Sequence, residues 1–372
     1  MSNVVHLTFP ARSQGRAARR AALLDRFAGT RRSRDDVFWL KENAEILNVL
    51  ETTGQTCNDG HLPADALAPY MSVYETLEKR LGFFPQYYRF FLSIALDLEA
   101  LGMTGDKAEG LVHWAHAQGL AEAELSDLQR AEARRLMLRR GVDPCGSAAE
   151  SDDLTERLMT FISRPRTFMV PNKKAAYELT HILFYLSEYG RKPTQLTQSA
   201  QQSLNFAGTL AYLDLNADLL AEICVALRYA GSTPPEAWEA WLAREMNGAT
   251  VEAWEGAMAH DDYHEFLVSN WAMATAGNES FLQAVPEGRI SIQAAPRPVG
   301  PLRRMSQCLL DLDEARSDDW SRMQEPIHEA LAEPWAIGHL ARAAEACADF
   351  DAFFAGFARA GLAAVPRKRV SA

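Results

Sequence analysis

The sequence predicts an all-α protein. Almost every segment repeats its apolar residues with the period of a helix, and no run alternates β-branched and polar residues as a half-buried strand would. Many of these segments open with Pro, Asp, Ser or Thr, which favour the first turn or the N-cap of a helix. Short connections between the segments predict antiparallel helix pairs.

The expected helices alternate with short turns along the whole chain. They begin near Asp36, Pro63, Pro85, Asp106, Ala121, Asp152, Asn172, Thr197, Leu215, Pro235, Asp261, Leu302, Asp319, Pro334 and Asp349. Helices of about 15 residues joined by short turns suit stacked αα-hairpins. We therefore expect the helix pairs to curve into an (α/α) toroid or solenoid.

Two stretches interrupt this pattern. Residues 141–153 are small and polar, and residues 277–301 are rich in Gly and Pro. We expect one all-helical domain over residues 35–366, or alternatively two helical lobes divided near 141–153. The second stretch predicts a long ordered loop, either covering a site or simply crossing the surface, with a short strand at Arg289–Gln293.

Composition bounds the class of protein. Apolar residues make up 48% and charged residues 23%, as in folded soluble proteins. No apolar run approaches the roughly 20 residues that span a bilayer, and the N-terminus lacks the core of a signal peptide. The five cysteines lie far apart without a CxxC pair, which argues against disulfides or a cysteine zinc site. We expect a cytoplasmic protein.

Charge is distributed unevenly along the chain. Residues 1–34 contain eight arginines and one acidic residue, and residues 367–372 form a second basic segment, although the net charge is −11. The strongly acidic body between these segments should repel nucleic acid, so no sequence-specific nucleic-acid binding is expected. The basic N-terminal arm either docks on this body, stays solvated, or touches RNA or an anionic membrane surface.

The segment Tyr177–Gly190 is the most informative part of the sequence. As a helix, it gathers Leu and Ile on one face and places Tyr177, His181, Tyr185 and Glu188 on the opposite face. A histidine between two tyrosines, with a carboxylate one turn on, is typical of the wall of a polar cavity. These four residues are the candidate catalytic groups.

Two further helices carry polar residues of the same kind. In the helix expected from Leu215 to Tyr229, Asp214, Asp218 and Glu222 follow one another at four-residue spacing. Such like charges destabilise a helix unless a cation, arginines or water compensates them. His264 opens a nearly all-apolar helix over residues 261–275.

In an αα toroid alternate helices face a common cavity. His181, Asp218, Glu222 and His264 would then form a site for zinc, iron or manganese, or for metal-free acid–base catalysis. Each histidine has an alternative role as a core residue bonded to the backbone, and the acidic stripe as a solvated face. We expect a cytosolic enzyme acting on a small molecule or peptide; the alternative is a non-catalytic helical-repeat scaffold or interaction protein.

These residues also carry a resemblance. The segments Asp35–Glu45, Tyr177–Gly190 and Ala217–Glu222 resemble an uncharacterised all-helical family of marine and purple alphaproteobacteria. Leu179–Gly190 has the pattern Leu-Thr-His-x-x-Phe-Tyr-x-x-x-Tyr-Gly, which is similar to a motif in other bacterial domains of unknown function. The resemblance extends over most of the chain and implies no particular activity.

Overall fold

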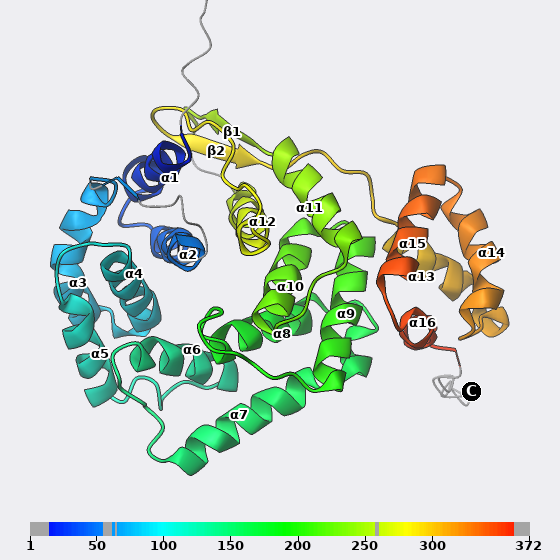
Figure 1. The fold of residues 1–372 in the computed structure, drawn as a ribbon, viewed down its shortest axis with the longest axis horizontal. Coiled ribbons are helices and arrows are strands. Elements are labelled where there is room, and N and C mark those ends of the chain that lie inside the picture. Colours follow the sequence, from blue (N-terminus) through cyan, green and yellow to red (C-terminus); the bar gives the residue numbers. More distant parts are fainter. Residues whose placement is uncertain (1–14, 55–61, 64, 257–259, 361–372) are drawn as a thin grey trace, which may run out of the picture. The chain divides into compact units, whose positions relative to one another are not determined.

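The protein is all-α, as the sequence predicts. The computed structural model describes residues 15–54, 62, 63, 65–256 and 260–360. These residues form sixteen α-helices and one small antiparallel sheet (Figure 1). Within them, no helix combines the length and the apolar character needed to cross a membrane. The four cysteines in this part of the chain are all free thiols.

The chain divides into two compact units. Unit 1 comprises residues 1–151 and 243–295, and unit 2 comprises residues 152–242 and 296–372. The first boundary, after Ser151, falls in the small polar stretch 141–153. That the units make a single domain, and that the helix pairs curve into a toroid or solenoid, stays a prediction.

Unit 1 holds the first six helices, a later helix and the sheet. Its helices are α1 (Arg16–Asp25), α2 (Val37–Gly54), α3 (Met71–Phe83), α4 (Tyr88–Ala100), α5 (Lys107–Ala117), α6 (Asp127–Leu138) and α12 (Tyr263–Thr275). The chain makes a π-helical turn at Arg26–Thr30 and 3₁₀ turns at Ala68–Tyr70 and Pro85–Tyr87. Strands β1 (Thr250–Ala253) and β2 (Ile290–Gln293) pair antiparallel, with Thr250 opposite Gln293.

Helix α2 is the centre of unit 1. It packs against α4 and α12, and its side chains Trp39, Ile46 and Leu47 are almost completely buried. Buried residues occur all round α2, as expected for a helix enclosed by neighbours. This enclosure also buries Glu42 and Asn43, whose polar groups must find partners inside the unit.

The described part of the expected basic arm is folded into unit 1. Leu23, Leu24 and Phe27 are at most 1% exposed, so α1 and the following turn contribute to the core. Arg19 and Arg26 donate hydrogen bonds to backbone carbonyls of Phe281 and Pro286 in the Gly- and Pro-rich stretch. Residues 1–14 and the basic segment 367–372 lie outside the described residues.

Unit 2 contains the helices that carry most of the candidate groups. They are α7 (Ala148–Ile162, beginning in unit 1), α8 (Lys173–Leu186), α9 (Gln198–Leu213), α10 (Ala217–Tyr229) and α11 (Glu236–Gly248, ending in unit 1), followed by α13 (Pro301–Asp311), α14 (Trp320–Leu331), α15 (Pro334–Ala346) and α16 (Phe350–Ala358). Short 3₁₀ turns occur at Pro165–Phe168 and Asp313–Ala315.

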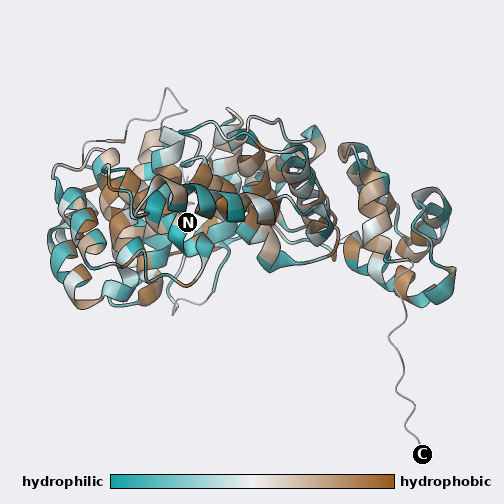
Figure 2. Cartoon of the chain, turned by 90° about the horizontal axis from the view of Figure 1, so that it is seen from below, coloured by the Kyte–Doolittle hydropathy of each residue, from teal (hydrophilic) through white to brown (hydrophobic). Residues whose placement is uncertain are grey.

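Helix α9 organises unit 2. It packs against α10, α13 and α15, and α10 in turn packs against α8. The side chains of Phe206 and Tyr212 on α9 and of Trp238 on α11 are fully buried. Gly208 is required there, because a Cβ atom at this position would lie 2.3 Å from the Trp238 ring. Figure 2 shows hydrophobic and hydrophilic residues along the same helices, as expected for helices that bury one side.

Candidate functional site

Helix α8 carries the first set of candidate residues, but it is shorter than the sequence suggests. It begins after the N-cap Asn172, whose side chain accepts a hydrogen bond from the Ala175 amide, and it ends at Leu186. The expected helix to Gly190 is therefore wrong over its last turn. Glu188 and Tyr189 have φ values of 48° and 55°, in the left-handed region.

The turn after α8 requires glycine at position 190. The φ of Gly190 is +83°, and a Cβ atom would lie 2.5 Å from the Tyr229 ring of α10. Because the helix ends at Leu186, Glu188 does not share the helical face of His181, and the prediction that it does is wrong. Its carboxylate instead forms an ion pair with Lys192.

Tyr177 links α8 to the first turn of α10. Its hydroxyl donates a hydrogen bond to Oδ1 of Asp218 over 2.7 Å. Burial, reinforced by the negative charge of Asp218, raises the pKa of Tyr177 well above its usual value, so the phenol stays protonated and remains a donor. The side chain of Asn216, the N-cap of α10, accepts a hydrogen bond from the Leu219 amide over 3.2 Å, and its proximity to Tyr177 partly offsets the rise in the pKa of that phenol.

A second contact between the same helices joins Thr180 and Glu222. The Thr180 hydroxyl lies 2.6 Å from Oε2 of Glu222, whose side chain is only 3% exposed. It also lies 2.9 Å from the Tyr177 carbonyl oxygen, and one hydroxyl proton can serve only one of these acceptors at a time. Thr180 therefore places a movable proton beside a buried carboxylate.

His181 is oriented by the backbone of its own helix. Its Nδ1 lies 2.7 Å from the Tyr177 carbonyl oxygen, which can only accept, so Nδ1 carries the proton. The other ring nitrogen, Nε2, is then the one suited to accept a proton or bind a metal. The side chain is 36% exposed, and Tyr185 packs edge-on against its ring at 5.9 Å.

The acidic stripe contains two carboxylates on α10 rather than three. Asp214 precedes this helix, which begins at Ala217, and it pairs with Lys173 over 3.2 Å. Asp218 and Glu222 remain at i and i+4. The hydroxyls of α8 compensate part of the repulsion between them, because each donates to one of the two carboxylates.

His264 belongs to unit 1, where it opens α12. Its Nε2 lies 3.9 Å from Oε1 of Glu45 on α2, and the neighbouring Tyr263 donates a hydrogen bond to the other oxygen of that carboxylate. In unit 2, Asp218 contacts Tyr177, and Glu222 contacts Thr180 and lies 3.6 Å from Nδ1 of His181; in unit 1, His264 lies beside Glu45. The expected four-residue set stays a prediction.

Comparison with known proteins identifies a family but no activity. A family model described as "Domain of unknown function (DUF6902)" matches residues 1–360. The chain belongs to this family. No curated protein and no solved structure matches it. Any functional assignment for this DUF6902 chain must therefore come from its own residues.

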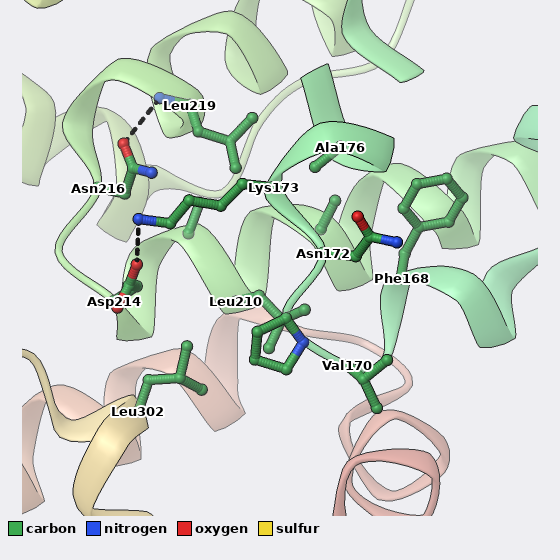
Figure 3. A pocket seen from close by; sticks show the side chains of 13 residues that line it. Phe168, Val170, Asn172, Lys173, Ala176, Leu210, Asp214, Asn216, Leu219 and Leu302 are labelled. Atoms are coloured by element: carbon green, nitrogen blue, oxygen red, sulfur yellow. Dashed lines mark hydrogen bonds and ion pairs between the residues drawn. The ribbon is translucent and has the colours of Figure 1, made fainter. Parts of the chain in front are cut away.

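A small pocket adjoins the contacts between α8 and α10 (Figure 3). Apolar side chains, including Val170, Leu210 and Leu302, line most of it, and Lys173 reaches across its rim to Asp214. Its cavity volume of about 30 Å³ has room for little more than a water molecule or two. The pocket is too small to hold a substrate by itself.

Two residues of this site escaped the sequence analysis, Thr180 and Asn216. Thr180 occupies the buried position between Tyr177 and His181, and Asn216 caps α10 while contacting Tyr177. The signal for Asn216 was present, because Asn before an apolar periodic segment is a common N-cap. For Thr180 the only signal was its place in the motif, since threonine is also common in ordinary helices.

Proposed function

We propose that the chain is an enzyme whose reactive groups are His181, Asp218 and Glu222 of unit 2, acting on a small molecule or peptide. One observation carries the proposal: α8 orients a histidine and places two hydroxyl donors on two carboxylates of α10. A solvated acidic face would not be matched residue for residue by hydroxyls of a neighbouring helix.

The proposed chemistry is that of a divalent metal site. Each hydroxyl contacts one oxygen of a carboxylate, and an ionised carboxylate has further lone pairs for a second partner. A histidine that donates its Nδ1 proton to a backbone carbonyl has the arrangement usual for metal-bound imidazoles. Zinc, iron and manganese accept this donor set, and without a metal the same groups would serve as acid and base.

The tyrosines have supporting roles in this proposal. Tyr177 holds Asp218 in place, and Tyr185 restricts the His181 ring from one side. His264 is retained as a fourth ligand on the sequence argument alone. We further propose that the Leu179–Gly190 motif marks this site in alphaproteobacterial members of the family.

Metal titration of the full chain tests the proposal. Cobalt(II) substitutes for zinc and reports its ligands by visible absorption, so the purified, chelator-treated protein is titrated with cobalt(II). We expect one ion per chain. We expect Asp218→Asn and Glu222→Gln each to weaken binding by at least tenfold, and His181→Ala to change the spectrum.

The matched control is His113→Ala. His113 lies 3.0 Å from Glu109 on the exposed surface of α5, so it also removes a histidine beside a carboxylate. Binding should be unchanged in this variant. Failure of the wild-type chain to bind cobalt(II), zinc(II) or manganese(II), or equal binding by all the variants, would refute the metal site.

The alternative function, an interaction protein, draws support from a different surface of unit 2. That surface lies on the opposite side of α9 and involves none of the residues named above for the metal site.

A further inference from the structure

Unit 2 has a groove that the proposed enzyme function does not use. It is bounded by α9, the start of α11 and the end of α15, and its volume is about 640 Å³. This volume falls within the range of roughly 300–1,000 Å³ that is typical of ligand pockets. On α9 the groove residues Gln201 and Asn205 lie on a different face from Leu210, which lines the small pocket beside the candidate site.

Small side chains leave space in this groove. Ala237, Ala240, Ala346 and Ala348 line it, and Ala240 is exposed. Because alanine extends no further than Cβ, a bound chain could approach the helices closely and place its own side chains between them.

The polar side chains of the groove match a peptide backbone. Gln201 and Asn205 are one turn apart on α9, and each has an amide that can donate and accept at once, as a backbone peptide group does. Gln201 contacts Ser232 over 3.2 Å, whereas the Asn205 side chain has no partner among the described residues.

The charges in the groove define the side chains it would accept. Arg342 and Glu345 extend from α15 and Glu236 from α11, and within the described residues none of the three forms an ion pair. Arginine binds a carboxylate through two parallel hydrogen bonds. Two glutamates beside one arginine disfavour a phosphate-rich ligand such as RNA and favour a ligand that also carries a basic group.

We propose that this groove binds a short extended peptide containing one acidic and one basic side chain. Gln201 and Asn205 hold its backbone, Arg342 binds its carboxylate, and Glu236 or Glu345 binds its cation. The proposal is independent of the metal site, because no residue is shared between them.

Fluorescence anisotropy with labelled hexapeptide pools tests this assignment. One pool has a fixed Glu and a fixed Lys with the other positions randomised, and the comparison pool has Ala at both fixed positions. With the full-length wild type, the Glu/Lys pool should bind saturably and at least tenfold more tightly than the Ala pool. Arg342→Glu should weaken its binding at least tenfold.

Ala240→Trp blocks the groove and should abolish binding. Since Ala240 is exposed, this variant should keep the wild-type melting temperature; should it fail to fold, Arg342→Glu still decides the question. Ala330→Trp, at an exposed alanine of α14 that does not line the groove, is the matched control and should bind normally. No saturable binding of the Glu/Lys pool, or equal binding by the wild type and both groove variants, overturns the proposal.

Discussion

At the scale of single residues, the Thr180 hydroxyl is a hydrogen-bond donor to the buried carboxylate of Glu222. Glu222 is 2% exposed, and a carboxylate at this depth is stable only while hydrogen-bond donors surround it. Thr180 supplies one of these donors over 2.6 Å, from a helix that Glu222 does not belong to. The same contact therefore satisfies the charge and fixes α8 against α10.

Replacing Thr180 by valine tests this contact. Valine keeps the shape of threonine but lacks the hydroxyl, so Glu222 loses a donor without a cavity being created. We expect the free energy of unfolding, measured by urea denaturation, to fall by about 1–3 kcal/mol.

The control for this change is Thr76→Val. The Thr76 hydroxyl is at the surface of α3, where it donates to backbone carbonyls of its own helix and accepts a hydrogen bond from the exposed Arg80 side chain over 3.2 Å. The loss there should stay within about 0.5 kcal/mol. Equal losses at the two positions would mean that Thr180 contributes nothing specific to Glu222.

Only part of this site could be predicted from the sequence. Helical spacing makes Tyr177 and His181 candidates on one helix and Asp218 and Glu222 candidates on another, because residues three and four apart share a face. The partner of each residue depends on how helices pack, which no local pattern encodes. Lys173 is the clearest case: its ion pair with Asp214 removes that residue from the predicted stripe.

At the level of elements, Arg31 fastens the N-terminal segment to unit 1. Its side chain is completely buried, and it donates to Glu42 of α2 and to Asp261, just before α12. The guanidinium also lies 5.0 Å from the ring centres of Phe27 and Tyr263. Burial alone would lower the pKa of Arg31, but hydrogen bonding to Asp261 and the charge of Glu42 raise it overall.

Removing this guanidinium should be costly. Arg31→Ala leaves the buried Asp261 carboxylate without its cation and removes one of the two arginines that pair with Glu42, the other being Arg32. We expect a loss of about 3–5 kcal/mol in the free energy of unfolding. Arg31→Lys should recover little of this stability, because a lysine ammonium lacks the planar set of donors with which the guanidinium contacts both carboxylates.

Arg157→Ala provides the comparison for Arg31. Arg157 pairs with Asp153 one turn away on α7, and both side chains are largely exposed. Chemical denaturation should show a loss of about 0.5 kcal/mol or less. A similar small loss for Arg31→Ala would show that the buried network is not stabilising.

Some helices and strands could be predicted from the sequence and others could not. Long amphipathic helices such as α8 and α9 begin at the N-caps Asn172 and Thr197, where the sequence places them. Helix α1 was missed because its many arginines suggested a solvated arm, although its leucines are buried. Strand β1 was not predicted, because its extended conformation depends on pairing with β2, which lies far along the sequence.

At the scale of the whole molecule, each of the two units is built from two separate segments of the chain. Unit 1 needs both of its segments, residues 1–151 and 243–295. Asp261 and Tyr263 in the second segment contact Arg31 and Glu45 in the first. Residues 1–151 alone would leave Arg31 without Asp261 and Glu45 without Tyr263, whereas Glu42 would keep Arg31 and Arg32. Unit 2 is likewise interrupted by a single excursion, residues 243–295.

The two ends of that excursion are close together in unit 2. The guanidinium of Arg297 lies 5.6 Å from the ring centre of Trp241, so the residues to be joined, Leu242 and Pro296, flank a direct contact. A flexible linker of about eight Gly and Ser residues has an average span of about 15 Å, which should suffice. Unit 2 also has its own core, in which Phe206 of α9 packs against Phe353 of α16 at 5.7 Å.

We therefore expect a shortened chain, residues 152–242 joined by such a linker to residues 296–360, to fold by itself. It should unfold cooperatively and give a near-ultraviolet dichroism signal from the buried Trp238 and Trp241. Residues 1–151 alone should give neither, because α2 lacks α12, the buried Arg31 lacks Asp261, and Glu45 lacks Tyr263. If the shortened chain does not unfold cooperatively, unit 2 does not fold without unit 1. If the 1–151 fragment is well folded, unit 1 does not need residues 243–295. Cooperative folding of unit 2 would also allow its cobalt(II) affinity to be measured without His264, separating the contribution of that histidine from those of His181, Asp218 and Glu222.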